Sequence, residues 1–268
     1  MPSLNSVLLK LVAQSEASIV YFMGRHTHAL FLGMINSSSP AIARKLHGDT
    51  PLRPFTVSSL IGDFNSTGKE LAIECNQDYY IRLTFLEDEI YDCFLDASAK
   101  AQGGTYKLDG AVFKVEGLIL DRKDSNLCGH QSYERLISAA RAQPKITMQF
   151  FSPSTFRSRG KRNVVFPLPS LVFASYIARW NQYSPFKLPP SLDKTIAEIA
   201  VASYELSTCS LSYVTYSETG FMGECHYVLP DSLSSKDAKS INILANFAFY
   251  CGTGAKTTMG MGQTRRIK

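Results

Sequence analysis

Hydrophobic and polar residues follow two different patterns along the first half of the chain. Short runs with an apolar residue at every second position predict half-buried strands, and apolar residues three or four apart predict helices. The expected strands cover residues 6–14, 54–58, 70–75, 79–85, 104–108 and 112–120. The expected helices cover 28–36, 40–47 and 87–101, the second with Ser39 as its N-cap and Pro40 in its first turn.

The second half repeats this order of elements. Its strands are expected at 146–151, 211–216 and 221–229, with a last strand from about Met259, and its helices at 171–183 and 234–250. A short helix at 132–141 precedes them, so we place a domain boundary at 142–145. The order strand, helix, strand, strand, helix, strand is typical of ferredoxin-like (RRM-like) domains. We therefore predict an α+β protein of two tandem ferredoxin-like domains, 1–142 and 143–268, with a C-terminal glycine-rich loop.

Composition narrows the class of protein without identifying it. Of the 268 residues, 45% are hydrophobic, which is enough for a buried core, and the net charge of +5 is compatible with a nucleic-acid partner. The chain has neither a long apolar run nor a secretory leader, so we expect a cytoplasmic protein without a membrane partner. The six cysteines lack Cys-x-x-Cys or zinc spacing, and catalytic-triad, HExxH and carboxylate-cluster patterns are missing. We therefore expect reduced thiols and neither a metal nor a cofactor.

The stretch from Gly252 to Lys268 combines four glycines with hydroxyl and cationic side chains and contains no acidic residue. Glycine tolerates positive φ and a close approach of the backbone to a ligand, so two Gly-x-Gly pairs predict a loop whose exposed amides suit a phosphate. The spacing does not fit the Walker loop, because Ala255 precedes Lys256, or the dinucleotide fingerprint, because Thr257 stands where that motif needs glycine. The alternative is a plain turn between a helix and an edge strand.

A second cationic cluster lies between the first strand and the first helix of the second half. Its members are Arg157, Arg159, Lys161 and Arg162. β-forming residues on both sides and a central glycine predict a protruding hairpin, and no acidic residue occurs between Lys145 and Asp193. An ordinary solvated turn is the alternative.

His47 is the first candidate for chemistry among the five histidines. It ends a predicted helix just before Gly48, which we expect at the C′ position, and the negative end of the helix dipole there favours the protonated imidazole. A partly protonated histidine can donate a proton to a leaving group, whereas the alternative is a helix cap without chemistry. Arg25, His26 and His28 precede the previous helix and form either an exposed polar loop or further parts of such a site.

Three segments resemble one family of proteins. The helix, glycine-rich loop and strand from Ala245 to Arg265 resemble the C-terminal signature of the RAMP superfamily of CRISPR proteins. The closest member family is the endoribonuclease that cuts CRISPR precursor RNA, the sixth numbered Cas family. Leu46-His47 followed by Pro54-Phe55-Thr56 resembles its leucine-histidine and proline-phenylalanine-threonine motif. The segment from Leu168 to Asn181 is similar to its proline-led helix, although chemically that stripe is a core face with Trp180 packed at one end.

The resemblance implies an endoribonuclease that makes CRISPR RNA from its precursor transcript without a metal ion. In that reaction the 2′-hydroxyl attacks the adjacent phosphate and leaves a 2′,3′-cyclic phosphate and a 5′-hydroxyl. The resemblance gives His47 the proton transfer; we assign charge stabilisation to Arg25, with His28 or Arg53 as substitutes. A tyrosine that some relatives carry falls on Leu32 here, so the resemblance does not extend to a tyrosine-assisted mechanism.

RNA binding falls to the two cationic segments. The family holds an RNA stem with a basic element at the position of the hairpin, and A-form RNA is gripped mainly through its phosphates. The expected RNA-binding residues are Arg157, Arg159, Lys161 and Arg162 in the hairpin, and Gly252, Gly254, Lys256, Thr257, Gly260, Gly262 and Arg265 in the loop. The expected partner is a CRISPR repeat stem-loop within its precursor transcript, with subunits of a CRISPR effector complex as further partners. Two other classes stay open, a catalytically silent RAMP subunit of such a complex and a module that binds a free nucleotide at the loop.

Overall fold

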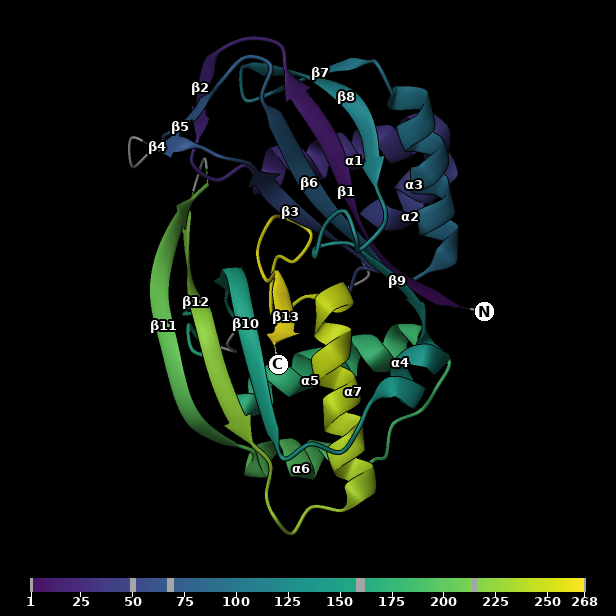
Figure 1. The fold of residues 1–268 in the computed structure, drawn as a ribbon, viewed down its shortest axis with the longest axis vertical. Coiled ribbons are helices and arrows are strands. Elements are labelled where there is room, and N and C mark those ends of the chain that lie inside the picture. Colours follow the sequence, from purple (N-terminus) through teal and green to yellow (C-terminus); the bar gives the residue numbers. More distant parts are fainter. Residues whose placement is uncertain (1, 49–51, 67–69, 158–161, 214–215, 268) are drawn as a thin grey trace. The chain divides into compact units, whose positions relative to one another are not determined.

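The computed structural model describes residues 2–48, 52–66, 70–157, 162–213 and 216–267, which form two compact units (Figure 1). The N-terminal unit consists of Ser3–His130 together with Thr258–Gly260. The C-terminal unit consists of Gln131–Thr257 and Met261–Lys268, with the first two residues of the chain. Helices pack on an antiparallel sheet in each unit, so the predicted α+β class is confirmed.

The main sheet of the N-terminal unit has the strand order β3-β6-β1-β8-β7. Its strands are β1 (Ser3–Ala13), β3 (Phe55–Ile61), β6 (Asp78–Phe85), β7 (Thr105–Leu108) and β8 (Ala111–Ile119), and the short β9 (Gly129–Ser132) pairs with β1. Neighbouring strands on this path are antiparallel, with Leu9 of β1 opposite Ile81 of β6. The first, second, third and fourth strands of a ferredoxin-like unit correspond to β1, β3, β6 and β8. Their order across the sheet, 2-3-1-4, confirms the predicted ferredoxin-like topology.

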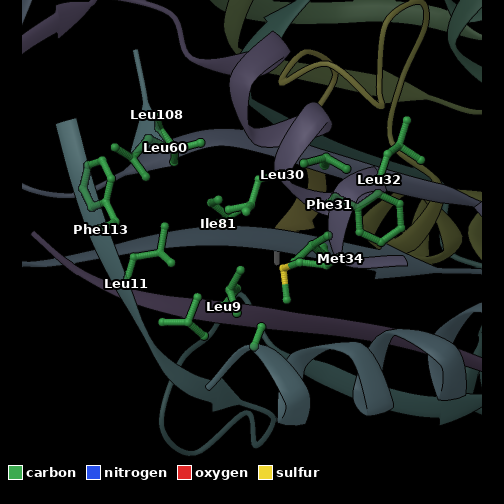
Figure 2. Packing of buried hydrophobic residues seen from close by; sticks show 14 of the residues in the cluster. Leu9, Leu11, Leu30, Phe31, Leu32, Met34, Leu60, Ile81, Leu108 and Phe113 are labelled. Carbon is green, nitrogen blue, oxygen red and sulfur yellow. The ribbon is translucent and has the colours of Figure 1, made fainter. Parts of the chain in front are cut away.

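Three helices complete the core of this unit. They are α1 (Gly24–Ser38), α2 (Pro40–His47) and α3 (Asp88–Ala101). Ser39 caps α2 as predicted, because its hydroxyl accepts a hydrogen bond from the amide of Ile42. Figure 2 shows apolar side chains of α1, among them Leu30 and Phe31, packed toward Leu9 and Ile81 of the sheet. Burying one side chain of this kind fully stabilises the fold by about 1.5–3 kcal/mol. The packing of these side chains therefore holds α1, with both of its ends, in place on the sheet.

A second, three-stranded sheet in the N-terminal unit has the order β2-β5-β4. Its strands are β2 (Ala17–Val20), β4 (Asn65–Ser66) and β5 (Glu70–Ile73). Only β5 was expected from the sequence. The other two contain four and two residues, which is too short for alternation of apolar and polar positions to be recognised.

The C-terminal unit repeats the topology with the strand order β11-β12-β10-β13. Its strands are β10 (Lys145–Ser154), β11 (Ala200–Ser212), β12 (Ser217–Val228) and β13 (Thr264–Ile267), and its helices are α4 (Tyr133–Ala139), α5 (Pro169–Tyr183), α6 (Leu192–Glu198) and α7 (Ser235–Cys251). Helices α5 and α7 pack side by side, with the ring of Trp180 edge-on to Phe247. Trp180 is completely buried, as its core interpretation predicts. The boundary placed at 142–145 leaves α4 in the first domain, whereas Tyr133 of α4 packs against Trp180 of the C-terminal unit.

Two strands of the C-terminal unit differ from the prediction. β11 runs from Ala200 to Ser212, well before the strand expected at 211–216, because its small polar residues are exposed on both faces and give no alternating pattern. β13 begins at Thr264 rather than near Met259. Gly260 and Gly262 have φ of 88° and 72°, and a strand cannot continue through the left-handed region.

Candidate functional site

The start of α1 and the strand β3 are joined by the tip of the glycine-rich loop. The amide of Gly260 donates a hydrogen bond of 2.8 Å to the carbonyl of Val57, and Ser58 and Gly260 form an isolated parallel bridge. Gly24 lies so close to the loop that a Cβ atom there would be 2.0 Å from the carbonyl oxygen of Met259. Thr27 fixes α1 to the same strand, because its hydroxyl donates to the Ser58 carbonyl at 2.7 Å. The loop tip therefore belongs structurally to the N-terminal unit.

His28 is the best-defined titratable group of this region. Its ring stacks on Phe55 at the start of β3, with centroids 6.1 Å apart and an interplanar angle of 15°. Burial lowers the pKa of His28, the nearby charges of His47 and Arg53 lower it further, and a hydrogen bond with the backbone of Thr258 opposes this shift. The net direction favours a neutral imidazole at physiological pH. His28, His47 and Arg53 thus share one electrostatic neighbourhood, in which the loop tip takes part.

His47 lies at the exposed end of α2, as the sequence predicts. The following residue is the C-cap of the helix rather than its predicted C′ residue, and Gly48 has φ of −58° and ψ of 167°. Its amide instead bonds to the carbonyls of Arg44 and Lys45, which ends the helix with extended backbone. The imidazole is left open to solvent and to a ligand.

Arg25 and His26 occupy the first turn of α1 but differ in their surroundings. Arg25 is exposed, and in the part of the chain that the structure describes no hydrogen bond or ion pair engages its guanidinium. The Nε2 atom of His26 lies 3.8 Å from the carboxylate of Asp109. Asp109 also accepts a hydrogen bond of 2.6 Å from the Val20 amide, so that carboxylate is held in place. Arg25 is therefore available to an anion, and His26 is partly engaged.

The glycine-rich loop has the predicted backbone conformation, but most of its glycine amides bond to the protein itself. Gly252, Gly254, Gly260 and Gly262 all have positive φ, between 68° and 88°. The expectation of exposed amides is wrong for Gly252, Gly260 and Gly262, whose amides donate to carbonyls of the protein itself. Side chains are excluded there because protein backbone approaches closely: a Cβ atom on Gly254 would lie 2.2 Å from the carbonyl oxygen of Thr155.

Lys256 is held by the protein. Its Nζ atom lies 2.7 Å from the carboxylate of Glu218 and 2.7 Å from the hydroxyl of Tyr216. It also lies over the rings of Tyr213 and Tyr216, at 4.3 and 4.0 Å from their centroids. Glu218 was not expected from the sequence, since it lies 38 positions earlier on β12 and nothing in its local pattern marks it. These contacts fasten the loop to the β11–β12 hairpin.

A buried cation anchors the residues on either side of Lys256 in the loop. Arg179 of α5, only 6% exposed, donates to the carbonyl of Gly254 at 2.9 Å and approaches the hydroxyl of Thr257 at 3.4 Å. One turn earlier the hydroxyl of Tyr176 bonds to that of Thr253 at 2.7 Å. The sequence holds a signal for both residues, because a charged Arg179 three positions after Tyr176 lies on the otherwise apolar face of this helix.

The basic hairpin is described only in its flanks. Phe156 and Val164 pair through two backbone hydrogen bonds of 3.0 and 2.9 Å, and Arg157 and Arg162 are exposed beside this pair. Arg159 and Lys161 lie outside the described residues. Arg265 of β13 packs over the ring of Phe151 and donates to the Gln149 side chain at 2.7 Å.

Two broader features of the described residues bear on the class of protein. No three His, Cys, Asp or Glu side chains within the described ranges gather as they would around a metal ion. No helix of that part of the chain is long and apolar enough to span a membrane.

Comparisons with known proteins identify one family. The family of the CRISPR-associated endoribonuclease Cas6 matches residues 148–264, and the N-terminal domain of CRISPR Cas6 matches residues 1–97. Cas6 of Thermus thermophilus in a product complex is similar over 100% of both chains, with a TM-score of 0.83 and 27% identity. A further structure of that protein gives a TM-score of 0.76 and 28% identity over 100% of this chain and 99% of the other.

A second Cas6, in a complex with a substrate mimic, has a TM-score of 0.76 and 23% identity over the full length of both chains, a likeness that concerns the fold. No curated protein matches the chain.

Proposed function

Since the chain belongs to the Cas6 family of CRISPR-associated endoribonucleases, we propose that it cleaves CRISPR repeat RNA within the precursor transcript and so releases CRISPR RNA. One observation carries the proposal: two histidines and an arginine, His28, His47 and Arg53, share an electrostatic neighbourhood at the start of β3. Acid–base cleavage of RNA requires such a set of groups. In this proposal residues 1–142 supply the chemistry and residues 143–268 supply most of the RNA grip.

The reaction divides between the two histidines. Neutral His28, whose pKa is lowered by burial, accepts the proton of the 2′-hydroxyl as the 2′-oxygen bonds to phosphorus. The bond from phosphorus to the 5′-oxygen breaks, and His47 donates a proton to that oxygen. The products are a 2′,3′-cyclic phosphate and a 5′-hydroxyl, and no metal ion is consumed or required. Arg25 and Arg53 stabilise the negative charge that develops on the phosphate oxygens.

RNA is held mainly by cationic side chains that are exposed to solvent. Arg157 and Arg162 are exposed beside the paired flanks of the hairpin, and with Arg159 and Lys161 they supply four positive charges to the phosphates of an RNA stem. Arg265 adds a planar guanidinium on the strand that follows the glycine-rich loop. The loop itself acts by shaping the site, because most of its glycine amides are engaged by the protein. The relative in a product complex supports this choice of ligand. The proposed partners are the precursor transcript and subunits of a CRISPR effector complex, and the proposed location is the cytoplasm.

The deciding experiment is incubation of the chain with labelled repeat RNA in excess EDTA. We expect a single cut at a rate that EDTA does not change. The 3′ end of the upstream product should not be joined to an adapter by RNA ligase until its cyclic phosphate has been removed. A rate restored only by divalent ions overturns the mechanism. Repeat RNA that is bound and left whole indicates the silent RAMP subunit, and binding of free nucleotide without RNA indicates the nucleotide module.

A further inference from the structure

Arg266 of β13 is a half-buried cation without an anionic partner. It stands opposite Met148 of β10, whose side chain is completely buried, so Arg266 projects from the face of the sheet that the helices cover. Within the described ranges no Asp or Glu carboxylate comes within ion-pair distance of its guanidinium. Burial lowers the pKa of Arg266, but arginine stays protonated in proteins. A partly desolvated positive charge is therefore left without compensation, which is unfavourable.

Two amide side chains hold this guanidinium in one orientation. Its Nη1 atom donates to Oδ1 of Asn246 on α7 at 3.3 Å, and its Nη2 atom donates to Oε1 of Gln143 at 2.5 Å. Asn242 of α7 donates to the backbone carbonyl of Gln143 at 3.0 Å, which fastens that segment to the helix. A guanidinium has five N–H donors, so these bonds leave three for a ligand, and the NH₂ groups of both amides can donate as well. The neutral amides thus orient the cation and do not neutralise it.

The segments that supply these side chains contain no acidic residue. Neither residues 135–192 nor residues 238–268 include an Asp or Glu. Lys239, which is partly buried, lies three positions before Asn242 and therefore on the same side of α7. Seven residues of helix separate Lys239 from Asn246, which extends the positive surface by about 10 Å. A cation with open donors on such a surface suits a multiply charged anion.

We propose that Arg266, oriented by Gln143 and Asn246, binds a phosphate of the repeat RNA backbone, an inference that rests on the proposed function. β13 is the edge strand of the order β11-β12-β10-β13. Its other arginine, Arg265, stands opposite Gln149 and bonds to that side chain on the opposite face of the sheet. An RNA backbone that crosses this edge therefore meets a guanidinium on each face. The planar fork of an arginine matches two oxygens of one phosphate.

The salt dependence of binding tests this contact. Arg266→Gln keeps a donor for Gln143 and Asn246 and removes the charge. With repeat RNA made non-cleavable by a 2′-deoxy nucleotide at the cut site, it should bind more weakly. Its slope of log K against log salt should be smaller by about 0.7–0.9, the value for one phosphate contact. Arg135→Gln, the same change at an exposed arginine of α4, should keep the wild-type slope. An unchanged slope in Arg266→Gln overturns the proposal.

A second variant supplies the missing anion from within the protein. Gln143→Glu places a carboxylate beside Arg266, so it should raise the melting temperature of the RNA-free chain and weaken its binding of RNA by competing with the phosphate. Gln182→Glu makes the same charge change at an exposed position of α5 and should alter neither quantity. Equal RNA binding by the two glutamate variants rejects the site.

The outcome can be separated from that of the proposed cleavage. A wild-type chain that binds repeat RNA without cutting it fails the cleavage proposal, and a flatter slope in Arg266→Gln still supports the contact. A chain that cuts the RNA and keeps its slope in Arg266→Gln retains the cleavage and loses the phosphate site. Inorganic phosphate is the remaining arm: stabilisation of the wild type and not of Arg266→Gln, together with an unchanged RNA slope, would assign the site to free phosphate and exclude the RNA.

Discussion

The two units share one topology and differ in the segments inserted between its strands and helices. Both have the strand order 2-3-1-4, but the N-terminal unit inserts α2 and the segment leading to β3 after its first helix. That insertion brings His47 and Arg53 to His28. The C-terminal unit instead carries the basic hairpin before α5, and its histidine, His226, bonds to Thr147 on the sheet. In the function proposed above, the shared fold therefore provides the platform, and the inserted segments assign chemistry to the N-terminal unit and ligand binding to the C-terminal unit.

The largest expected effect separates the histidines of the two units. His47→Ala should lower the cleavage rate of repeat RNA by about 100- to 10,000-fold, the range for one proton-transfer group, with binding changed only a few fold. His226→Ala is the matched control in the C-terminal unit and should cleave like the wild type. Single-turnover cleavage at saturating enzyme measures both. Full activity of His47→Ala would move the proton donor to His26 or His28.

The next effect compares two glycines with opposite surroundings. Gly260→Ala adds a Cβ atom 2.7 Å from the ring of Phe22 at φ of 88°, so it should lower the free energy of unfolding by at least about 1–3 kcal/mol. Gly33→Ala in α1 meets nothing within 4 Å and should leave stability equal or raise it by up to about 1 kcal/mol. Urea denaturation measures both. Equal stability of the two variants would show that the loop tip does not hold the N-terminal unit.

Lys256 distinguishes a structural cation from an RNA-binding one. Lys256→Ala leaves the mostly buried Glu218 carboxylate without its cation, so we expect about 1–3 kcal/mol of lost stability. Lys236→Ala, an exposed lysine on α7, should change stability by less than about 0.5 kcal/mol. Thermal melting without RNA is the measurement. A Lys256→Ala chain as stable as the wild type, but weaker in RNA binding, would return this lysine to the RNA site.

A smaller effect tests the hairpin of the C-terminal unit. Changing Arg157, Arg159, Lys161 and Arg162 to alanine should weaken stem binding and flatten its salt dependence. Each lost phosphate contact lowers the slope of log K against log salt by about 0.7–0.9. Alanine at Arg122 and Lys123, an exposed cationic pair in the N-terminal unit, is the control and should leave the slope unchanged. An unaltered slope in the quadruple variant would make the hairpin an ordinary solvated turn.

The smallest effect concerns pH. If neutral His28 accepts the proton, cleavage should fall on the acid side as His28 becomes protonated, at a pH below that of an unperturbed histidine because its pKa is lowered. Arg53→Gln removes one of the cations that lower this pKa, so the acid limb of the pH–rate profile should move to higher pH. Arg44→Gln, an exposed cation of α2, should leave the limb in place. A limb that moves to lower pH in Arg53→Gln would exclude His28 as the titrating group.

Much of the fold follows from the sequence because its elements are strongly patterned. The alternating strands β1 and β6 and the helices α3, α5 and α7 lie close to their predicted positions. β11 could not be found in this way, because a strand exposed on both faces has no apolar side for the pattern to report.

The candidate site was only partly accessible from the sequence. The histidine and arginine candidates could be named because they fall in local motifs, whereas their proximity depends on how α1, α2 and the segment before β3 pack together. The loop illustrates the limit: its four positive φ values follow from glycine, but the partners of its amides and of Lys256 lie far away in sequence. The residues of the loop therefore predicted its backbone conformation well and predicted the partners of its amides and of Lys256 poorly.

The contact between Gly24 and the carbonyl of Met259 has a consequence for the timing of synthesis. The start of α1 leaves the ribosome about 230 residues before the loop tip that packs on it. At about 5–20 residues per second, this delay lasts roughly 10 to 50 s. During that time Thr258 cannot bond to His28, and the ring lacks the contact that opposes the lowering of its pKa. In the proposed function, a nuclease made beside other transcripts thus lacks part of its proposed site until residues 258–260 have been made.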